Sequence, residues 1–159
     1  MSEPSLGSDV ATPSPEPEAG LGAFALGVLG VLALLARLPG LGRSLWYDEL
    51  FTLSHFSSSP IDALTRQIAA NNHPPASLLA WVSSAFASGE VGLRLPFAAA
   101  GAAGVVALGW AVGRWAGRPA GLLAGGVAAI APVHVLASQQ IRGYPLMLLA
   151  AALLIGLLP

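Results

Sequence analysis

Four long apolar stretches with almost no charge are the feature that most constrains what this chain can fold into. They cover residues 21–38, 95–112, 119–137 and 144–159. A helix rises about 1.5 Å per residue, so a helix that crosses a hydrocarbon core about 30 Å thick needs about 20 residues. The stretches approach that length. The sequence therefore predicts an all-α, polytopic membrane protein with about four transmembrane helices.

The composition agrees with this class. The 159 residues are 55% hydrophobic and 9% charged, with a mean hydropathy of +0.71, whereas soluble domains carry about 25% charged residues. The net charge is −1, so no basic surface exists to bind nucleic acid. Cysteine is absent, which excludes a disulfide framework and a thiol nucleophile. We therefore expect membrane lipid as a partner of this chain, and no nucleic acid.

The polar segments divide into a tail and a long loop. Residues 1–20 contain four acids and four prolines among small residues, a composition that predicts a disordered acidic tail. The transmembrane domain then covers residues 21–159, with a long first outer loop at residues 39–93. Because the last apolar stretch stops without a polar tail, we expect the chain to be the front part of a longer protein.

Amphipathic helices are expected inside the long loop. Ser59, followed by Pro60 and Asp62, is typical of a helix start and predicts a short helix on the membrane surface. Residues 75–88 are apolar but too short for an ordinary span, so an interfacial or re-entrant helix is favoured over a membrane crossing.

Orientation and helix packing can also be predicted. The short loop with Arg114 and Arg118 lacks acids and is expected on the cytoplasmic side, which places the long loop outside; Arg37 and Arg43 favour the opposite orientation. Gly121 and Gly125 are four residues apart, a spacing that lets two helices approach closely in a membrane.

Three polar clusters stand at the ends of the expected spans. Asp48 and Glu49 are adjacent acids near the membrane, and they fit either a helix start or a functional carboxylate. His73 precedes two prolines and fits either a loop residue or an acid–base group. Arg142 fits either a side chain that reaches lipid head groups or a planar clamp on a phosphate. His55 and His134 lack metal-ligand spacing and are interpreted as structural.

Four short segments occur in an order that resembles a known family. They are an arginine and aromatics before an Asp-Glu pair (residues 43–49), a His-Pro-Pro step (73–75), an Arg-Leu-Pro step (94–96) and a Ser-Gln-x-x-Arg-x-Tyr segment (138–144). Together they resemble the N-terminal part of GT-C type glycosyltransferases that use lipid-linked sugars. This group includes protein O-mannosyltransferases and the lipid A aminoarabinose transferase.

The resemblance implies a role for each matching residue. Asp48 would be the catalytic base that deprotonates the acceptor hydroxyl, with Glu49 as a supporting catalytic acid. Arg142 would hold the phosphate of the donor, with Tyr144 beside it. His73 would lie near the same phosphate, where contact with a divalent metal is left open.

The expected function is therefore that of a membrane glycosyltransferase, or its N-terminal piece, in a bacterial plasma membrane. It would move a sugar from a polyprenyl-phosphate donor to a hydroxyl of a protein, glycan or lipid acceptor on the outer face, in a single displacement with inversion. Two alternatives remain: a transporter or permease fragment whose charges line a solute path, and a non-catalytic membrane assembly protein. Transporters usually keep such charges at mid-membrane, whereas here they flank the spans.

Overall fold

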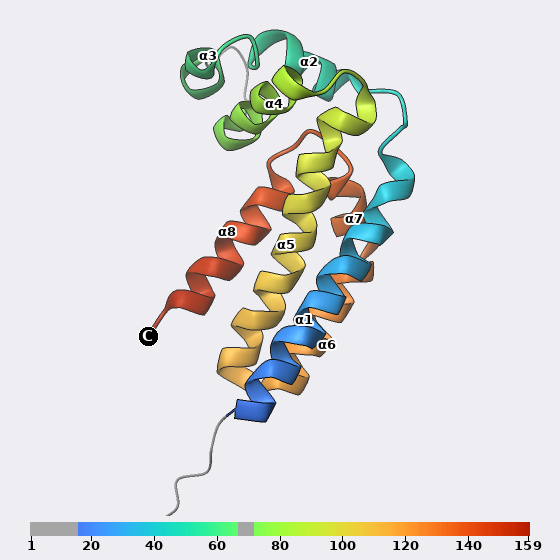
Figure 1. Cartoon of the computed structure of the whole chain (residues 1–159). Coiled ribbons are helices and arrows are strands. Elements are labelled where there is room, and N and C mark those ends of the chain that lie inside the picture. The colour runs from blue at the N-terminus through green and yellow to red at the C-terminus, as the bar shows by residue number, and fades with distance from the viewer. Residues whose placement is uncertain (1–15, 67–71) are drawn as a thin grey trace, which may run out of the picture.

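The computed structural model describes residues 16–66 and 72–159, and in this part of the chain every regular element is a helix. The all-α class is therefore confirmed. The helices, shown in Figure 1, are α1 (Glu16–Arg37), the 3-10 helix η1 (Leu38–Gly40), α2 (Tyr47–His55), α3 (Pro60–Thr65), α4 (Pro74–Phe86), α5 (Glu90–Ala116), α6 (Arg118–Ile130), α7 (Pro132–Ser138) and α8 (Tyr144–Leu157).

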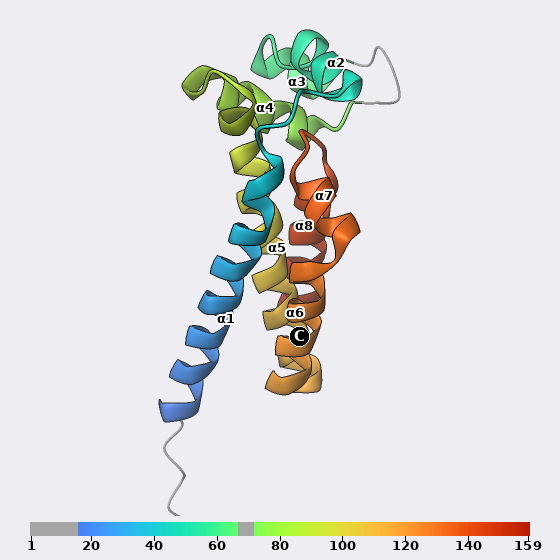
Figure 2. The same ribbon diagram turned by 90° about the vertical axis from the view of Figure 1, so that its right-hand side faces the viewer.

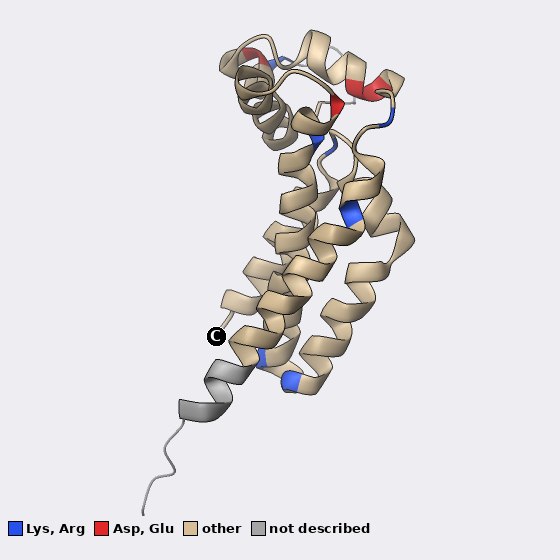
Figure 3. Cartoon of the chain, turned by 45° about the vertical axis from the view of Figure 1, so that its right-hand side comes forward, with Lys and Arg blue, Asp and Glu red and all other residues tan. Residues whose placement is uncertain are grey.

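The helices form a bundle with a cap over one end. The bundle contains α1, α5, α6 and α8, and α5 packs against each of the other three. Three shorter helices lie across the upper end of the bundle: α2, α3 and α4 (Figures 1 and 2). The described acidic side chains are at the capped end, while arginines occur at both ends (Figure 3). The described parts of the long loop predicted at residues 39–93 thus form a helical cap, and α5 begins within its last residues, at Glu90.

The number of full-length spans is lower than expected. Within the described residues, two helical segments are long and apolar enough to cross a membrane, Gly22–Gly40 and Glu90–Ala116. The third expected span is divided into α6 and α7, which are bent by 63° and would count as one broken span. The fourth is α8, whose 14 residues span about 21 Å at 1.5 Å per residue. The described residues thus contain two helices, or three with the broken span, that are long and apolar enough to cross a membrane, which is fewer than the about four transmembrane helices predicted.

The break in the third span has a local cause. Pro132 has no N–H to donate within a helix, and its ring disfavours the helical conformation at the preceding residue. Ala131 accordingly adopts φ −58° and ψ 115°. Mean hydropathy over residues 119–137 does not register this backbone restriction, so the apolar stretch looked continuous.

Two predictions for the ends of helices can be compared with the structure. Ser59 caps α3 as predicted, because its hydroxyl oxygen accepts a hydrogen bond from the Asp62 N–H at 3.0 Å. α1 begins at Glu16, before the boundary expected at residue 20. An acid and a proline in the first turn are favourable at a helix N-terminus, which explains the earlier start. The rest of the predicted tail, residues 1–15, lies outside the described residues.

Close packing of α6 on α5 depends on glycine, as the spacing of Gly121 and Gly125 predicted. A Cβ atom on Gly121 would lie 2.3 Å from the carbonyl oxygen of Gly109, and one on Gly125 would lie 3.3 Å from the carbonyl oxygen of Val105, both on α5. The Gly121 contact is with backbone, so a side chain there must separate the helices.

We predict that Gly121→Ala lowers the thermal stability of the protein in detergent, by about 1–3 kcal/mol, because the extra methyl overpacks the α5–α6 contact. The matched control is Gly126→Ala on the same helix, where an added Cβ meets no atom within 4 Å. Thermal unfolding of both variants provides the measurement. Equal midpoints for the two variants would contradict the packing role.

We also predict that cysteines at the two ends of α5 react with a membrane-impermeant thiol reagent from opposite sides of a sealed vesicle. Ser88 and Ala116 are exposed and flank the helix, and the chain contains no other cysteine. Ser88→Cys and Ala116→Cys would each be labelled with intact and with lysed vesicles. Labelling of both from one side would show that α5 does not cross the membrane.

Candidate active site

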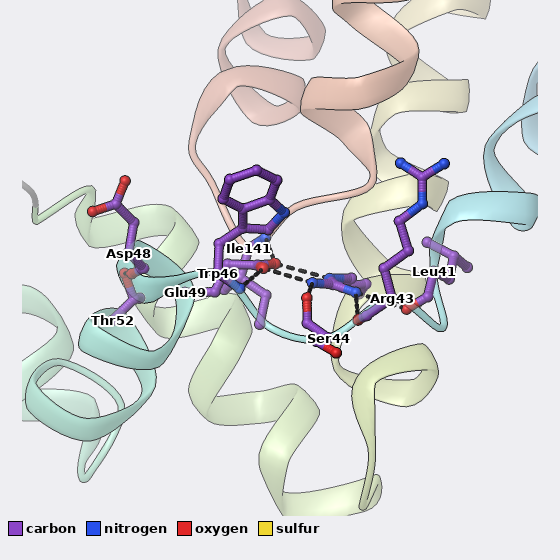
Figure 4. Close-up of polar contacts among 9 residues, drawn as sticks. Leu41, Arg43, Ser44, Trp46, Asp48, Glu49, Thr52 and Ile141 are labelled. Atoms are coloured by element: carbon purple, nitrogen blue, oxygen red, sulfur yellow. Dashed lines mark hydrogen bonds and ion pairs between the residues drawn. The ribbon is translucent and has the colours of Figure 1, made fainter.

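A buried ion pair between Arg94 and Glu49 joins α5 to the cap. Both side chains are 1% exposed, and the Nη2–Oε2 distance is 2.6 Å. Arg94 Nε donates a second hydrogen bond to Oε1 of Glu49 at 2.9 Å. The remaining donors reach backbone carbonyl oxygens of Leu41 (2.9 Å), Arg43 and Ser44 (3.1 Å). The planar guanidinium thus fixes the segment that leads from η1 to α2 (Figure 4).

The carboxylate of Glu49 also accepts hydrogen bonds from two backbone N–H groups. It accepts the Trp46 N–H at 2.9 Å, which caps the first turn of α2, and the Ile141 N–H at 2.9 Å. Burial raises the pKa of Glu49, but the hydrogen bonds from Arg94, Trp46 and Ile141 outweigh that effect and hold the pKa below its usual value. Glu49 is therefore an ionised carboxylate that links three segments of the chain.

Asp48, the neighbouring acid, has a different environment. Its side chain is 46% exposed and forms an ion pair with the guanidinium of Arg142, which is 18% exposed. Figure 4 shows the Asp48 carboxylate pointing away from the Glu49–Arg94 pair. Successive helical residues face different directions, so one acid of the pair is buried while the other reaches the surface.

The segment between α7 and α8 brings the other predicted residues to this place. His73 lies at the start of α4, and its ring is so close to Gly143 that a Cβ there would lie 3.2 Å from the His73 Cγ. The rings of His73 and Tyr144 have centroids 6.2 Å apart. Asp48, His73, Arg142 and Tyr144 thus gather around one loop, and a shared functional role for them stays a prediction.

Two adjacent hollows open beside the loop. The smaller, about 90 Å³, is lined by Trp46, Asp48, Glu49, Gln140 and Arg142. The larger, about 270 Å³, shares Trp46 and Gln140 with the first and continues toward Arg43 and Gln139. The Asp48–Arg142 pair lies at one end of these hollows, and amide and indole groups line the other end. Such a surface suits a polar ligand.

Two residues that position the site are not indicated by the sequence patterns. Arg94 belongs to the Arg-Leu-Pro step, and its pairing with Glu49 joins positions 45 residues apart. Gln139 is buried and donates from Nε2 to the carbonyl oxygen of Arg37 at 3.0 Å. Gly40 allows this contact, because a Cβ there would lie 2.2 Å from the Gln139 side chain. Sequence spacing alone does not indicate such long-range pairs.

The two histidines interpreted as structural have protein contacts. Nδ1 of His134 lies 2.7 Å from a guanidinium nitrogen of Arg37, which is fully buried. The ring of His55 stacks on Phe51 with centroids 4.1 Å apart. Among residues 16–66 and 72–159, no three His, Cys, Asp or Glu side chains come together as a candidate metal site.

Comparisons with protein-family models, with curated proteins and with solved structures gave no match. Function is therefore inferred from the residues and the geometry described above.

We predict that Arg94→Leu destabilises the protein by about 3–5 kcal/mol, because it leaves the Glu49 carboxylate buried without its cation. The double variant Arg94→Leu with Glu49→Leu is expected to recover part of the loss, since no unpaired charge remains. Thermal unfolding of the single and double variants gives the coupling between the two residues. Additive losses would show that the pair acts through packing alone.

The lowered pKa of Glu49 predicts a pH dependence. A carboxyl group whose pKa is lower in the folded state contributes stability that is fully present above its unfolded value of about 4.3 and is lost as the pH falls through the folded value. Between pH 7 and pH 3 the wild-type melting temperature should therefore fall more than that of Glu49→Gln. Parallel pH profiles would contradict the assignment.

Proposed function

We propose that the protein is a membrane glycosyltransferase, or part of one, that uses a polyprenyl-phosphate sugar as donor. The observation that carries the proposal is the convergence of Asp48, Arg142, His73 and Tyr144 beside two adjacent hollows at the capped end. The resemblance in sequence order to GT-C type enzymes supports the same reading. The proposed setting is a bacterial plasma membrane that the chain crosses several times.

In this proposal the Asp48–Arg142 ion pair is exchanged when the donor binds. A donor phosphate offers Arg142 an anion with planar, bidentate hydrogen bonding, so it can replace the carboxylate as the partner of the guanidinium. Asp48, which is half exposed, is then available to the acceptor hydroxyl. His73 and Tyr144 flank the phosphate from the other side of the loop.

The proposed reaction is a single displacement. The acceptor O–H gives its proton to Asp48, and the oxygen forms a bond to the anomeric carbon of the sugar. The bond between that carbon and the phosphate oxygen breaks, and its electron pair leaves with the polyprenyl phosphate. Arg142 stabilises the charge of the leaving phosphate, which needs no proton, so one carboxylate suffices. The configuration at the anomeric carbon inverts.

In this proposal Glu49 supports the chemistry by positioning other residues. Its oxygens already accept four hydrogen bonds, from Arg94, Trp46 and Ile141, so it offers no lone pair directed at an acceptor. It instead fixes the backbone of Ile141 beside Arg142 and the first turn of α2 beneath Asp48. The acceptor class, whether protein, glycan or lipid, is proposed only as a hydroxyl on the outer face.

The transporter alternative receives less support from the geometry. Charges that line a solute path are usually held near mid-membrane beside broken helices. Asp48 lies in the cap and Arg142 lies in the loop at the same end of the bundle. Their location favours chemistry at the level of lipid head groups.

We predict that Asp48→Asn abolishes sugar transfer, with a loss of at least about a hundredfold expected for removal of a general base. The measurement is transfer of a radiolabelled sugar from its polyprenyl phosphate in membranes that contain the protein. The matched control is Asp62→Asn, a surface acid of the same cap, whose pKa is lowered by hydrogen bonds from Ser59 and Ser58. The control should retain transfer.

Arg142→Lys provides a second variant for the donor site. A lysine keeps the charge but loses the bidentate fork, so the apparent affinity for donor should fall more than the rate at saturation.

Unchanged transfer in Asp48→Asn, with normal insertion, would overturn the catalytic assignment.

A further inference from the structure

Trp46 and Gln140 lie between the two hollows at the capped end, because both residues line both hollows. The smaller hollow also contains Asp48 and Arg142, the groups that the proposed reaction uses. The larger hollow continues toward Arg43. The proposed reaction step involves neither Trp46 nor Gln140, yet a ligand that occupied both hollows would contact both residues.

The Trp46 side chain is attached to a fixed backbone but is left largely uncovered by protein. The Trp46 N–H donates to Oε2 of Glu49 at 2.9 Å, and its carbonyl oxygen accepts from the Leu50 N–H at 3.0 Å. The residue is nevertheless 65% exposed. An exposed indole ring on a fixed backbone suits stacking against the C–H face of a sugar ring, since this contact buries apolar area on both sides.

Two neighbouring glutamines differ in what their amides bind. Gln139 is buried, and its Nε2 donates to the carbonyl oxygen of Arg37 at 3.0 Å. Gln140 is half-buried, and within residues 16–66 and 72–159 its side-chain amide has no hydrogen-bond partner. An amide carries both donors and an acceptor, so the Gln140 side chain can pair with a sugar hydroxyl in either sense.

The two hollows differ in size. The smaller, about 90 Å³, has the volume of about three water molecules at about 30 Å³ each, and it suits a small group such as a phosphate or a hydroxyl. The larger, about 270 Å³, has the volume of about nine water molecules, which suits one sugar ring. A donor sugar therefore fits the larger hollow and not the smaller one.

Charge also differs between the hollows. The described residues that line the larger hollow include two arginines and no acid. Arg94 is neutralised by Glu49. Arg43 is exposed, and its guanidinium takes no part in the hydrogen bonds around Arg94 (Figure 4). The Arg43 guanidinium thus offers hydrogen-bond donors to the oxygen atoms of a ligand in this hollow.

We propose that the larger hollow holds the sugar of the donor, with its ring stacked on Trp46 and its hydroxyls hydrogen-bonded to Gln140 and Arg43. The donor phosphate remains at Arg142 in the smaller hollow. This inference rests on the proposed function and adds to it a subsite for one pyranose ring. The anomeric carbon, which joins the sugar to the phosphate, then lies beside Trp46 and Gln140, with Asp48 in the lining of the smaller hollow.

The test compares binding of a sugar-free and a sugar-bearing carrier to the full chain purified in detergent. The probes are farnesyl phosphate and its mannosyl and glucosyl esters, each used to displace radiolabelled farnesyl phosphate. Wild type should bind at least one ester more tightly than farnesyl phosphate, by about tenfold, because the sugar adds stacking and hydrogen bonds. Equal or weaker binding of both esters would overturn the subsite.

Substitutions of Trp46 separate sugar stacking from apolar contact with the membrane. Trp46→Leu keeps an apolar side chain without a ring, so the preference for the ester should fall by about fivefold, whereas Trp46→Phe should retain most of it. The matched control is Tyr47→Leu, because Tyr47 is 76% exposed and lines neither hollow. The control should keep the wild-type preference. Equal preferences in Trp46→Leu and Trp46→Phe would contradict stacking.

Gln140→Ala tests the amide. It should lower the preference for the ester by about threefold, the effect of one lost hydrogen bond, without changing the affinity for farnesyl phosphate. An unchanged preference in Gln140→Ala would contradict its contact with the sugar.

Binding of farnesyl phosphate itself distinguishes this inference from the proposed function. The Trp46 variants should bind it as wild type does, which also shows that they are folded. Wild-type binding of farnesyl phosphate without preference for either ester would overturn the subsite alone. Binding of none of the three probes would overturn the proposed function and the subsite with it. If Trp46→Leu loses farnesyl phosphate binding, Gln140→Ala decides: a reduced preference supports the subsite, and an unchanged preference overturns it.

Discussion

The buried ion pair between Glu49 and Arg94 is the interaction on which the arrangement of the capped end depends. Arg94 belongs to the long helix α5, and through Glu49 and three backbone carbonyls it holds the segment from η1 to the start of α2. Glu49 adds the backbone of Ile141. Desolvation of two charges is costly, but here all of their polar atoms have partners, which is the condition for such a pair to persist.

This arrangement gives two adjacent acids separate tasks. Glu49 is ionised and enclosed, while Asp48 reaches the surface and meets Arg142. The Glu49 carboxylate positions both the helix that carries Asp48, the proposed base, and the loop that carries Arg142, the proposed phosphate ligand. The proposed transfer chemistry thus depends on an acid that does not itself react.

Local features of the fold were predictable from the sequence, whereas long-range ones were not. Ser59 as a helix cap and Gly121 as a close-packing site follow from propensity and spacing within a few residues. The expected order of the spans placed Asp48, His73, Arg142 and Tyr144 on the same side, but the contacts that gather them around one loop do not follow from the sequence. The break at Pro132 was missed because hydropathy averages conceal backbone geometry, and the Glu49–Arg94 pair was missed because its partners are distant in sequence.

The burial of Arg37 changes how the charges near the membrane should be counted. The arginine donates to carbonyl oxygens of Ala33 and Ala129 and contacts His134, so it is enclosed by protein at the bend of the broken span. A cation used in this way has no head group to interact with and carries little weight as an orientation signal. If Arg37 is not counted among the orientation signals, Arg43 is the one arginine that argues against a cytoplasmic α5–α6 loop. Arg114 and Arg118, which are exposed, argue for it.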